Sequence, residues 1–226
     1  MIRILIVDDH AIVRKGYLRI FSLEKDFEVV GEAADAAGAT ALLAQTSPDI
    51  ALVDLSLRNT SGIHLIDTIK QRRPATRVIV LSMHCTSAHV LRSLRAGADG
   101  YLSKNADPEF VVSAIREAAR GKKVFSPDAA ESLAAIATGG TNPLDELTSR
   151  EFDIFSLAVQ GKPVQDIADA LYLSPRTIFN YLSTIRQKLN VRNDFELLHL
   201  AIQYGVVDAP SSGQIGRASC RERVYV

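Results

Sequence analysis

Five short apolar runs occur along the first half of the chain, and each is followed by a segment with helical spacing. Unbroken apolar runs of about four to eight residues are typical of strands that are buried on both faces of a parallel sheet. Regular alternation of strand and helix predicts a doubly wound, five-stranded parallel α/β sheet with helices on both faces. The strands are expected at 3–7, 27–33, 50–53, 77–81 and 100–102, and the helices near 11–22, 36–45, 62–72, 86–95 and 108–120.

The pattern changes after residue 121. Residues 122–143 hold a short alanine-rich helix and then a run with Gly139-Gly140, a composition typical of a flexible linker. Residues 208–226 have no periodicity after a Pro-Ser-Ser break, and we interpret them as a disordered, non-native tail. The α/β domain is therefore expected to cover residues 1–121.

Signals for helix starts crowd between residues 144 and 207. Thr148 and Glu151 form a capping box, and Ser174 with the following proline marks another helix start. Four short helices in this length predict a small all-α domain. The tight turn before Ser174 separates the second helix from the third, and this arrangement predicts a helix-turn-helix.

Composition limits the classes of function. The 226 residues include 26 basic and 26 acidic ones, so any binding to nucleic acid has to come from a local patch. Cys85 and Cys220 lie in unlike contexts, which indicates neither a disulfide framework nor a metal motif. No apolar run approaches the ~18 residues of a membrane helix. We expect a cytoplasmic protein.

Reactive side chains follow the predicted strands. Asp8 with Asp9, Asp54, Ser82 and Lys104 stand at the carboxyl ends of four separate runs, where ligand sites form in doubly wound sheets. Crowded carboxylates favour a bound cation, and oxygen ligands beside a phosphoryl group favour Mg²⁺. The cluster is suited to carrying a phosphoryl group on a carboxylate. Asp9 alone has a simpler interpretation, as a cap of the next helix.

This layout resembles the receiver domain of two-component response regulators, and residues 144–207 narrow the resemblance to the NarL/FixJ family with a LuxR-type helix-turn-helix. The LuxR-type signature is carried by Leu147-Thr148-Ser149-Arg150-Glu151, Gly161-Lys162, Ile167-Ala168, Leu171, Ser174, Thr177-Ile178, Ile185 and Lys188-Leu189. The resemblance implies that Asp54 is the phosphoacceptor, with Lys104 as the phosphate-sensing lysine. It implies Ser82 and Tyr101 as the switch pair, and Mg²⁺ bound by Asp9, Asp54 and the backbone carbonyl of Ser56, with Asp8 acting through water.

The implied function is a transcription regulator, not an enzyme, that is phosphorylated by a histidine kinase, forms a homodimer when phosphorylated and binds double-stranded DNA. In relatives, the unphosphorylated receiver can cover the recognition helix. The DNA contacts are expected from Arg176, Thr177, Phe179, Asn180, Ser183, Arg186 and Lys188. Two alternatives are a phosphorylation-independent DNA- or protein-binding module and an aspartate-nucleophile phosphatase. The phosphatase generally needs an acid pair separated by one residue, whereas Asp8 and Asp9 are adjacent.

Several positions depart from the family pattern. Arg58 stands where the family usually has proline, and Asn105 stands where many receivers have a cis-proline. Phe179 and Ser183 replace the usual lysines, and Tyr181 replaces a histidine. Because these phosphate contacts are missing, we expect a weak dependence of DNA affinity on salt. The alternative is that Phe179 and Tyr181 serve a protein interface.

Overall fold

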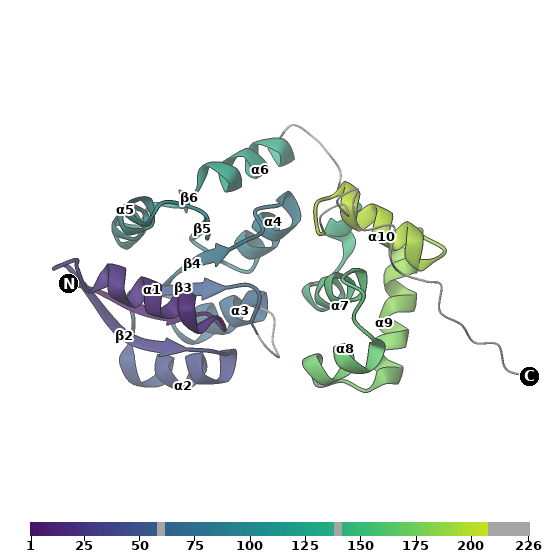
Figure 1. Ribbon diagram of the computed structural model, residues 1–226, viewed down its shortest axis with the longest axis horizontal. Coiled ribbons are helices and arrows are strands. Elements are labelled where there is room, and N and C mark those ends of the chain that lie inside the picture. The colour runs from purple at the N-terminus through teal and green to yellow at the C-terminus, as the bar shows by residue number, and fades with distance from the viewer. Residues whose placement is uncertain (58–61, 138–141, 208–226) are drawn as a thin grey trace, which may run out of the picture.

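The computed structural model describes residues 1–57, 62–137 and 142–207 as two folded parts, an α/β domain and a helical domain (Figure 1). All strand pairs of the α/β domain are parallel, in the order β2-β1-β3-β4-β5-β6. The strands are β1 (Ile2–Val7), β2 (Phe27–Ala33), β3 (Ile50–Asp54), β4 (Arg77–Ser82), β5 (Gly100–Ser103) and β6 (Val124–Phe125). The predicted doubly wound parallel sheet is confirmed, with one more strand than expected.

Alternate residues of the strands supply two apolar cores, one on each face of the sheet. On one face Leu5 and Val7 pack with α2, α3 and α4, and on the other Ile4 and Ile6 pack with α1 and α5. Each face is thus covered by helices, which keeps every strand except the edges out of water. The helices are α1 (Ala11–Phe21), α2 (Ala36–Thr46), α3 (Gly62–Arg72), α4 (Ser87–Arg95) and α5 (Pro108–Ala119).

Part of the segment expected as a linker packs on the α/β domain. Strand β6 pairs with β5, and α6 (Pro127–Ala137) packs on it through Ala129 and Leu133. Gly100 permits this pairing, because a Cβ atom there would lie 2.7 Å from the carbonyl oxygen of Val124. A two-residue strand is too short to be recognised from periodicity. The Gly139-Gly140 run lies outside the described residues, as do Arg58 and the tail from residue 208.

The helical domain begins with a short 3₁₀ helix, η1 (Pro143–Glu146), and continues with α7 (Ser149–Val159), α8 (Val164–Leu171), α9 (Pro175–Lys188) and α10 (Asp194–Gln203). The capping box at Thr148 is present, and the side chain of Ser174 accepts a hydrogen bond from Thr177 N. Helices α8 and α9 form the predicted helix-turn-helix. Their apolar faces share one core that includes Ile167, Ile178 and Ile185.

None of the helices in the described part of the chain has the length and apolar character needed to cross a bilayer.

Candidate functional site

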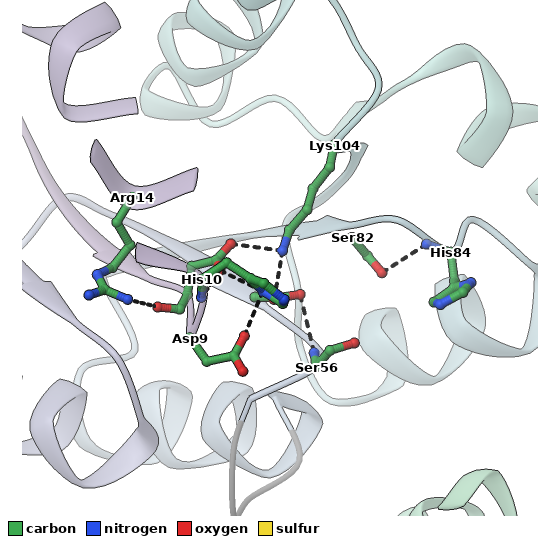
Figure 2. Close-up of polar contacts among 9 residues, drawn as sticks. Asp9, His10, Arg14, Ser56, Ser82, His84 and Lys104 are labelled. Carbon is green, nitrogen blue, oxygen red and sulfur yellow. Dashed lines mark hydrogen bonds and ion pairs between the residues drawn. The ribbon is translucent and has the colours of Figure 1, made fainter. Parts of the chain in front are cut away.

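Acidic and basic side chains meet at the carboxyl ends of the central strands (Figure 2). Asp8 follows β1, Asp54 ends β3, and Lys104 follows β5. The Lys104 Nζ atom lies 2.7 Å from Asp54 Oδ2 and 2.8 Å from Asp8 Oδ2. Side chains that are almost 100 residues apart in sequence therefore converge at one point, as the strand-end argument predicts.

Burial sets the electrostatics of this group. Asp8 and Asp54 are each 2% exposed. Burial raises the pKa of the Asp54 carboxyl, although the hydrogen bond and charge of Lys104 oppose the rise. Burial alone would lower the pKa of the Lys104 ammonium, but its hydrogen bonds to Asp54 and Asp8 outweigh this effect and raise it. One ammonium group thus faces two buried carboxyls, and the site favours further positive charge.

A group of possible metal ligands, three carboxylates and one imidazole, lies beside the lysine. Asp8, Asp9, His10 and Asp54 each offer one ligand atom within 4.8 Å of the others. The His10 Nδ1 atom lies 2.7 Å from Asp9 Oδ1. Three carboxylates at this spacing are a donor set for a hard divalent cation such as Mg²⁺.

The loop after β3 holds the Asp54 carboxylate from its other side. Ser56 N donates to Asp54 Oδ1 at 3.1 Å, and Gly62 N donates to the carbonyl of Leu55 at 3.0 Å. A Cβ atom at Gly62 would lie 2.5 Å from Leu55 Cα and closer still to the Asp54 carbonyl. Gly62 therefore lets α3 begin against the backbone of Asp54. Sequence reasoning missed this glycine, because only its position shortly after the Asp54 loop distinguishes it.

The two predicted switch residues both contact His84. The Ser82 hydroxyl accepts a hydrogen bond from His84 N at 3.1 Å, and the Tyr101 hydroxyl donates to the carbonyl of His84. Tyr101 is completely buried, and this burial raises the pKa of its phenol. The ring of Tyr101 is thus turned into the core in this structure, and the segment after β4 connects it to Ser82.

The helix-turn-helix presents most of the predicted DNA contacts to solvent. On α9, Phe179 is 60% exposed, and Arg176, Asn180 and Ser183 are exposed as well. The Thr177 hydroxyl forms a hydrogen bond of 2.8 Å with the hydroxyl of Ser174, the residue that caps α9. Tyr181 is partly buried against the core of the domain.

Two predicted DNA contacts form ion pairs with acids of their own domain. Arg186 Nη2 lies 2.6 Å from Asp194 Oδ1, and Lys188 Nζ lies 2.7 Å from Glu151 Oε2. Glu151 is 5% exposed and also accepts from Thr148 N through the capping box. Sequence reasoning missed both pairs, because the acids come from other elements of the domain.

Comparisons with known proteins agree with both halves of the structure. A family model for the response regulator receiver domain matches residues 4–116, and one for bacterial regulatory proteins of the luxR family matches residues 145–201. The chain is 36% identical over 212 residues to the response regulator UvrY of Escherichia coli (strain K12), covering 92% of this chain and 97% of UvrY. It is 34% identical to the response regulator GacA of Pseudomonas aeruginosa, covering 93% of this chain and all of GacA.

Solved structures give the same picture. RcsB from Salmonella typhimurium aligns with a TM-score of 0.71 at 27% identity, covering 88% of this chain and 95% of that one. A LuxR-family response regulator from Aurantimonas sp. SI85-9A1 aligns with a TM-score of 0.58 at 41% identity, covering 60% of this chain and 97% of that one. With the receiver and helix-turn-helix folds in their expected order, the chain belongs to the NarL/FixJ family of two-component response regulators, which are phosphorylation-dependent, DNA-binding transcription regulators.

Proposed function

We propose that Asp54 accepts a phosphoryl group from a histidine kinase and that this modification controls DNA binding through α9. The observation that supports the proposal best is the Asp54 carboxylate itself, which is held between Lys104 Nζ at 2.7 Å and Ser56 N at 3.1 Å. A carboxylate fixed in this way has a defined direction of attack. Asp8, with its Oδ2 atom 2.8 Å from the same ammonium, keeps Lys104 in place.

In the proposed transfer, an Asp54 oxygen forms a bond to phosphorus while the bond from phosphorus to the donor histidine nitrogen breaks. The ammonium of Lys104 offsets negative charge on the transferring oxygens. The donor set fits Mg²⁺, and we assign it to Asp9, Asp54 and the backbone carbonyl of Ser56, with Asp8 acting through water. A bound Mg²⁺ supplies charge neutralisation for the carboxylates and the phosphoryl oxygens.

The switch is assigned to Ser82 and Tyr101. The new phosphoryl group carries acceptor oxygens, and the Ser82 hydroxyl turns to donate to one of them. Its hydrogen bond with His84 N is then lost. The Tyr101 hydroxyl donates a hydrogen bond to the carbonyl of His84, so Tyr101 repacks when the His84 segment moves.

The output is assigned to α9. Its exposed side chains Arg176, Phe179, Asn180 and Ser183 would face a major groove, with Asn180 suited to adenine and Phe179 to a thymine methyl group. A homodimer would present two such helices to two half-sites. The RcsB structures include complexes with DNA, one of them with promoter rprA in the presence of phosphomimetic BeF3⁻. We infer that the protein acts in the cytoplasm, where a bacterial chromosome lies, and that it is a regulator and not an enzyme.

We also assign the domain limits. Residues 1–121 form the phosphoacceptor domain, 144–207 the DNA-binding domain, and 208–226 a non-native tail. Residues 122–143 connect the two domains, with β6 and α6 packed on the first.

Labelling with acetyl phosphate and Mg²⁺ tests the acceptor. The intact chain is expected to gain one phosphoryl group by mass and to bind DNA more tightly, whereas Asp54→Asn gains none. Label on Asp54→Asn would place the acceptor elsewhere. Multiple turnover of a simple phosphate ester would favour a phosphatase, and unchanged DNA affinity after labelling would favour a phosphorylation-independent module.

A further inference from the structure

The two domains enclose a cavity at the phosphorylation site. Ala88 of α4 belongs to the core cluster of the helical domain, and the ring of His89 meets the ring of Phe152 of α7 with centroids 5.4 Å apart. Figure 1 shows α7 facing the carboxyl ends of the strands. The cavity at this contact has a volume of about 410 Å³. Small-molecule sites in proteins commonly measure about 300–1,000 Å³ and favour domain interfaces, so this cavity can admit a small ligand.

One side of the cavity is the phosphorylation site itself, since Asp9, Ser56 and Ser82 line it. Ser56 N donates to Asp54 Oδ1 at 3.1 Å, and the ammonium of Lys104 lies 2.7 Å from Asp54 Oδ2. A ligand in the cavity therefore lies next to the carboxylate that we assign as the phosphoacceptor.

The helical domain adds apolar side chains to the cavity. The apolar residues around it include Leu57, Ile63, Phe152, Leu157, Leu171 and Val206. The last four of these belong to the helical domain. Apolar walls favour a hydrocarbon group over water, because each methylene that becomes buried raises affinity roughly fourfold. The cavity thus combines polar groups at the phosphorylation site with an apolar wall from the other domain.

Charge sets the direction in which an anionic ligand lies in this cavity. The side chain of Lys104 at the phosphorylation site is 7% exposed, so its charge is poorly screened, and a Mg²⁺ ion at the acids would add to it. On the α7 side, Asp153 carries the same sign of charge as a phosphate. Lys162 also lines the cavity, but it is exposed, and water and salt screen its charge. A molecule with a phosphoryl group at one end and an apolar group at the other therefore fits with its phosphoryl group toward Lys104.

Ser156 supplies a hydrogen-bonding group on the α7 side. Its hydroxyl is buried and has no hydrogen-bond partner within the described part of the chain. Hydroxyls elsewhere in the helices bond the carbonyl four residues earlier, as those of Thr40, Ser93 and Thr184 do. Because no such bond holds the Ser156 hydroxyl, rotation about its Cα–Cβ bond can turn it to a ligand in the cavity that this residue lines.

We propose that the cavity is a binding site for small acyl phosphates, with the phosphoryl group at Asp54 and the acyl group against α7. The proposal rests on the assignment of Asp54 as the acceptor, and it names a second class of phosphoryl donor for that residue. In the transfer an Asp54 oxygen bonds to phosphorus as the bond from phosphorus to the acyl oxygen breaks, and the electron pair leaves with the carboxylate. The helical domain thereby selects the donor by its acyl group, a role separate from DNA binding.

Two donors that differ only in chain length test the acyl site in the full chain. Butyrate and acetate are equally good leaving groups, so butyryl phosphate and acetyl phosphate differ mainly by two methylenes. At low donor concentration with Mg²⁺, butyryl phosphate is expected to label the protein about tenfold faster, because both methylenes become buried. Mass spectrometry of the intact chain measures both rates. Equal rates, or a faster rate with acetyl phosphate, would overturn the proposal.

Substitutions at Ser156 show whether the preference comes from the cavity. Ser156→Leu fills the space and is expected to abolish the preference for butyryl phosphate. Ser156→Ala adds no bulk and removes only the hydroxyl, so it should slow both donors about fivefold and keep the preference. Thr184, which has an exposed side chain on α9, gives the matched controls, because Thr184→Leu and Thr184→Ala should change neither rate. Unchanged rates in Ser156→Ala, or a preference that survives in Ser156→Leu, would contradict the assigned site.

A failure of the acceptor assignment gives a different result. Label on Asp54→Asn from either donor would show that the phosphoryl group is carried elsewhere. An unlabelled Asp54→Asn together with equal donor rates in the parent protein would contradict the acyl site and leave the acceptor in place.

Discussion

The ammonium of Lys188 lies 2.7 Å from Glu151 Oε2, so a cation expected to contact DNA is held within its own domain. Arg186 is paired in the same way with Asp194. Among the four cations between Ser174 and Arg192, only Arg176 and Arg192 have no ion pair in the described part of the chain. The electrostatic contribution to DNA binding is therefore expected to be small.

This pairing predicts a shallow salt dependence. Two phosphate contacts per half-site correspond to a slope of about −1.8 in log affinity against log salt, and four contacts correspond to about −3.6. Fluorescence anisotropy with duplex DNA at several salt concentrations measures the slope. We expect Arg176→Ala to reduce it by about 0.9 and Lys188→Ala to leave it unchanged. A slope near −3.6 would show that the two ion pairs open on DNA.

Removal of the amine at the phosphorylation site should destabilise the α/β domain. Lys104→Met leaves Asp8 and Asp54 buried without their shared cation, which typically costs about 3–5 kcal/mol. The pKa of Asp54 then rises further above its unfolded value, so the folded state binds more protons and stability is regained as pH falls. Urea unfolding at pH 7 and pH 5 measures this.

Divalent cation provides the control for the same variant. Mg²⁺ is expected to restore part of the lost unfolding free energy of Lys104→Met at pH 7, because it supplies positive charge to the same carboxylates. In Lys104→Met with Asp8→Asn, both the cost of the missing amine and the response to Mg²⁺ should be smaller. An equal response in both proteins would argue against a cation site at these acids.

The contact between α4 and α7, where the ring of His89 meets the ring of Phe152, is expected to weaken in acid. Burial, followed by the charges of His84 and Arg92, lowers the pKa of His89 from 6.5 to about 4. The His89 Nδ1 atom also lies 2.8 Å from the Thr86 hydroxyl, and Phe152 covers the ring. When α4 and α7 separate, His89 takes up a proton more readily than it does in the contact. The stability that neutral His89 gives to this contact is therefore complete above about pH 6.5 and is lost as pH falls toward 4.

X-ray scattering between pH 7 and pH 4.5 checks this expectation. The radius of gyration of the parent protein should increase over this range. His89→Asn, which cannot titrate but keeps a polar atom near Thr86, should show a smaller increase. His199→Asn is the matched control, because His199 is exposed on α10 and is not among the groups that shift the pKa of His89. If all three proteins respond equally, His89 is not the titrating group at the interface.

The strand-end chemistry could be predicted from sequence because it depends only on topology. Asp54 ends β3 and Lys104 directly follows β5, two strands of one parallel sheet, and parallel strands bring their carboxyl ends to one edge whatever the loops do. The contacts of Arg92 could not be predicted in this way. In sequence Arg92 is an ordinary helix cation, and its acceptors, the carbonyls of Leu144 and Leu147, are backbone atoms of another domain. The packing of one domain on the other depends on the shapes of the two surfaces, and the spacing of apolar residues along the sequence does not show these shapes.

The turn of the helix-turn-helix contains a strained residue. Tyr172 ends α8 with φ 53° and ψ 43°, in the left-handed region, and its side chain is exposed. A non-glycine residue typically loses about 1–2 kcal/mol in this region, and asparagine loses less because its short side chain bonds locally. Tyr172→Asn is therefore expected to raise the unfolding free energy of the helical domain by about 0.5–1 kcal/mol. Asparagine is a better choice than glycine here, because glycine would also increase the conformational entropy of the unfolded chain.

Asn190 offers the reverse substitution for comparison. It has φ 52° at the end of α9, so it is already the residue that suits this conformation. Asn190→Ala should lower the unfolding free energy by a similar amount, measured by urea unfolding followed by circular dichroism. Opposite signs for the two variants would identify backbone conformation as the cause, because the two side chains are both exposed and lie in different turns. A loss of stability in Tyr172→Asn would instead mean that the exposed ring of Tyr172 makes a contact worth more than the relief of strain.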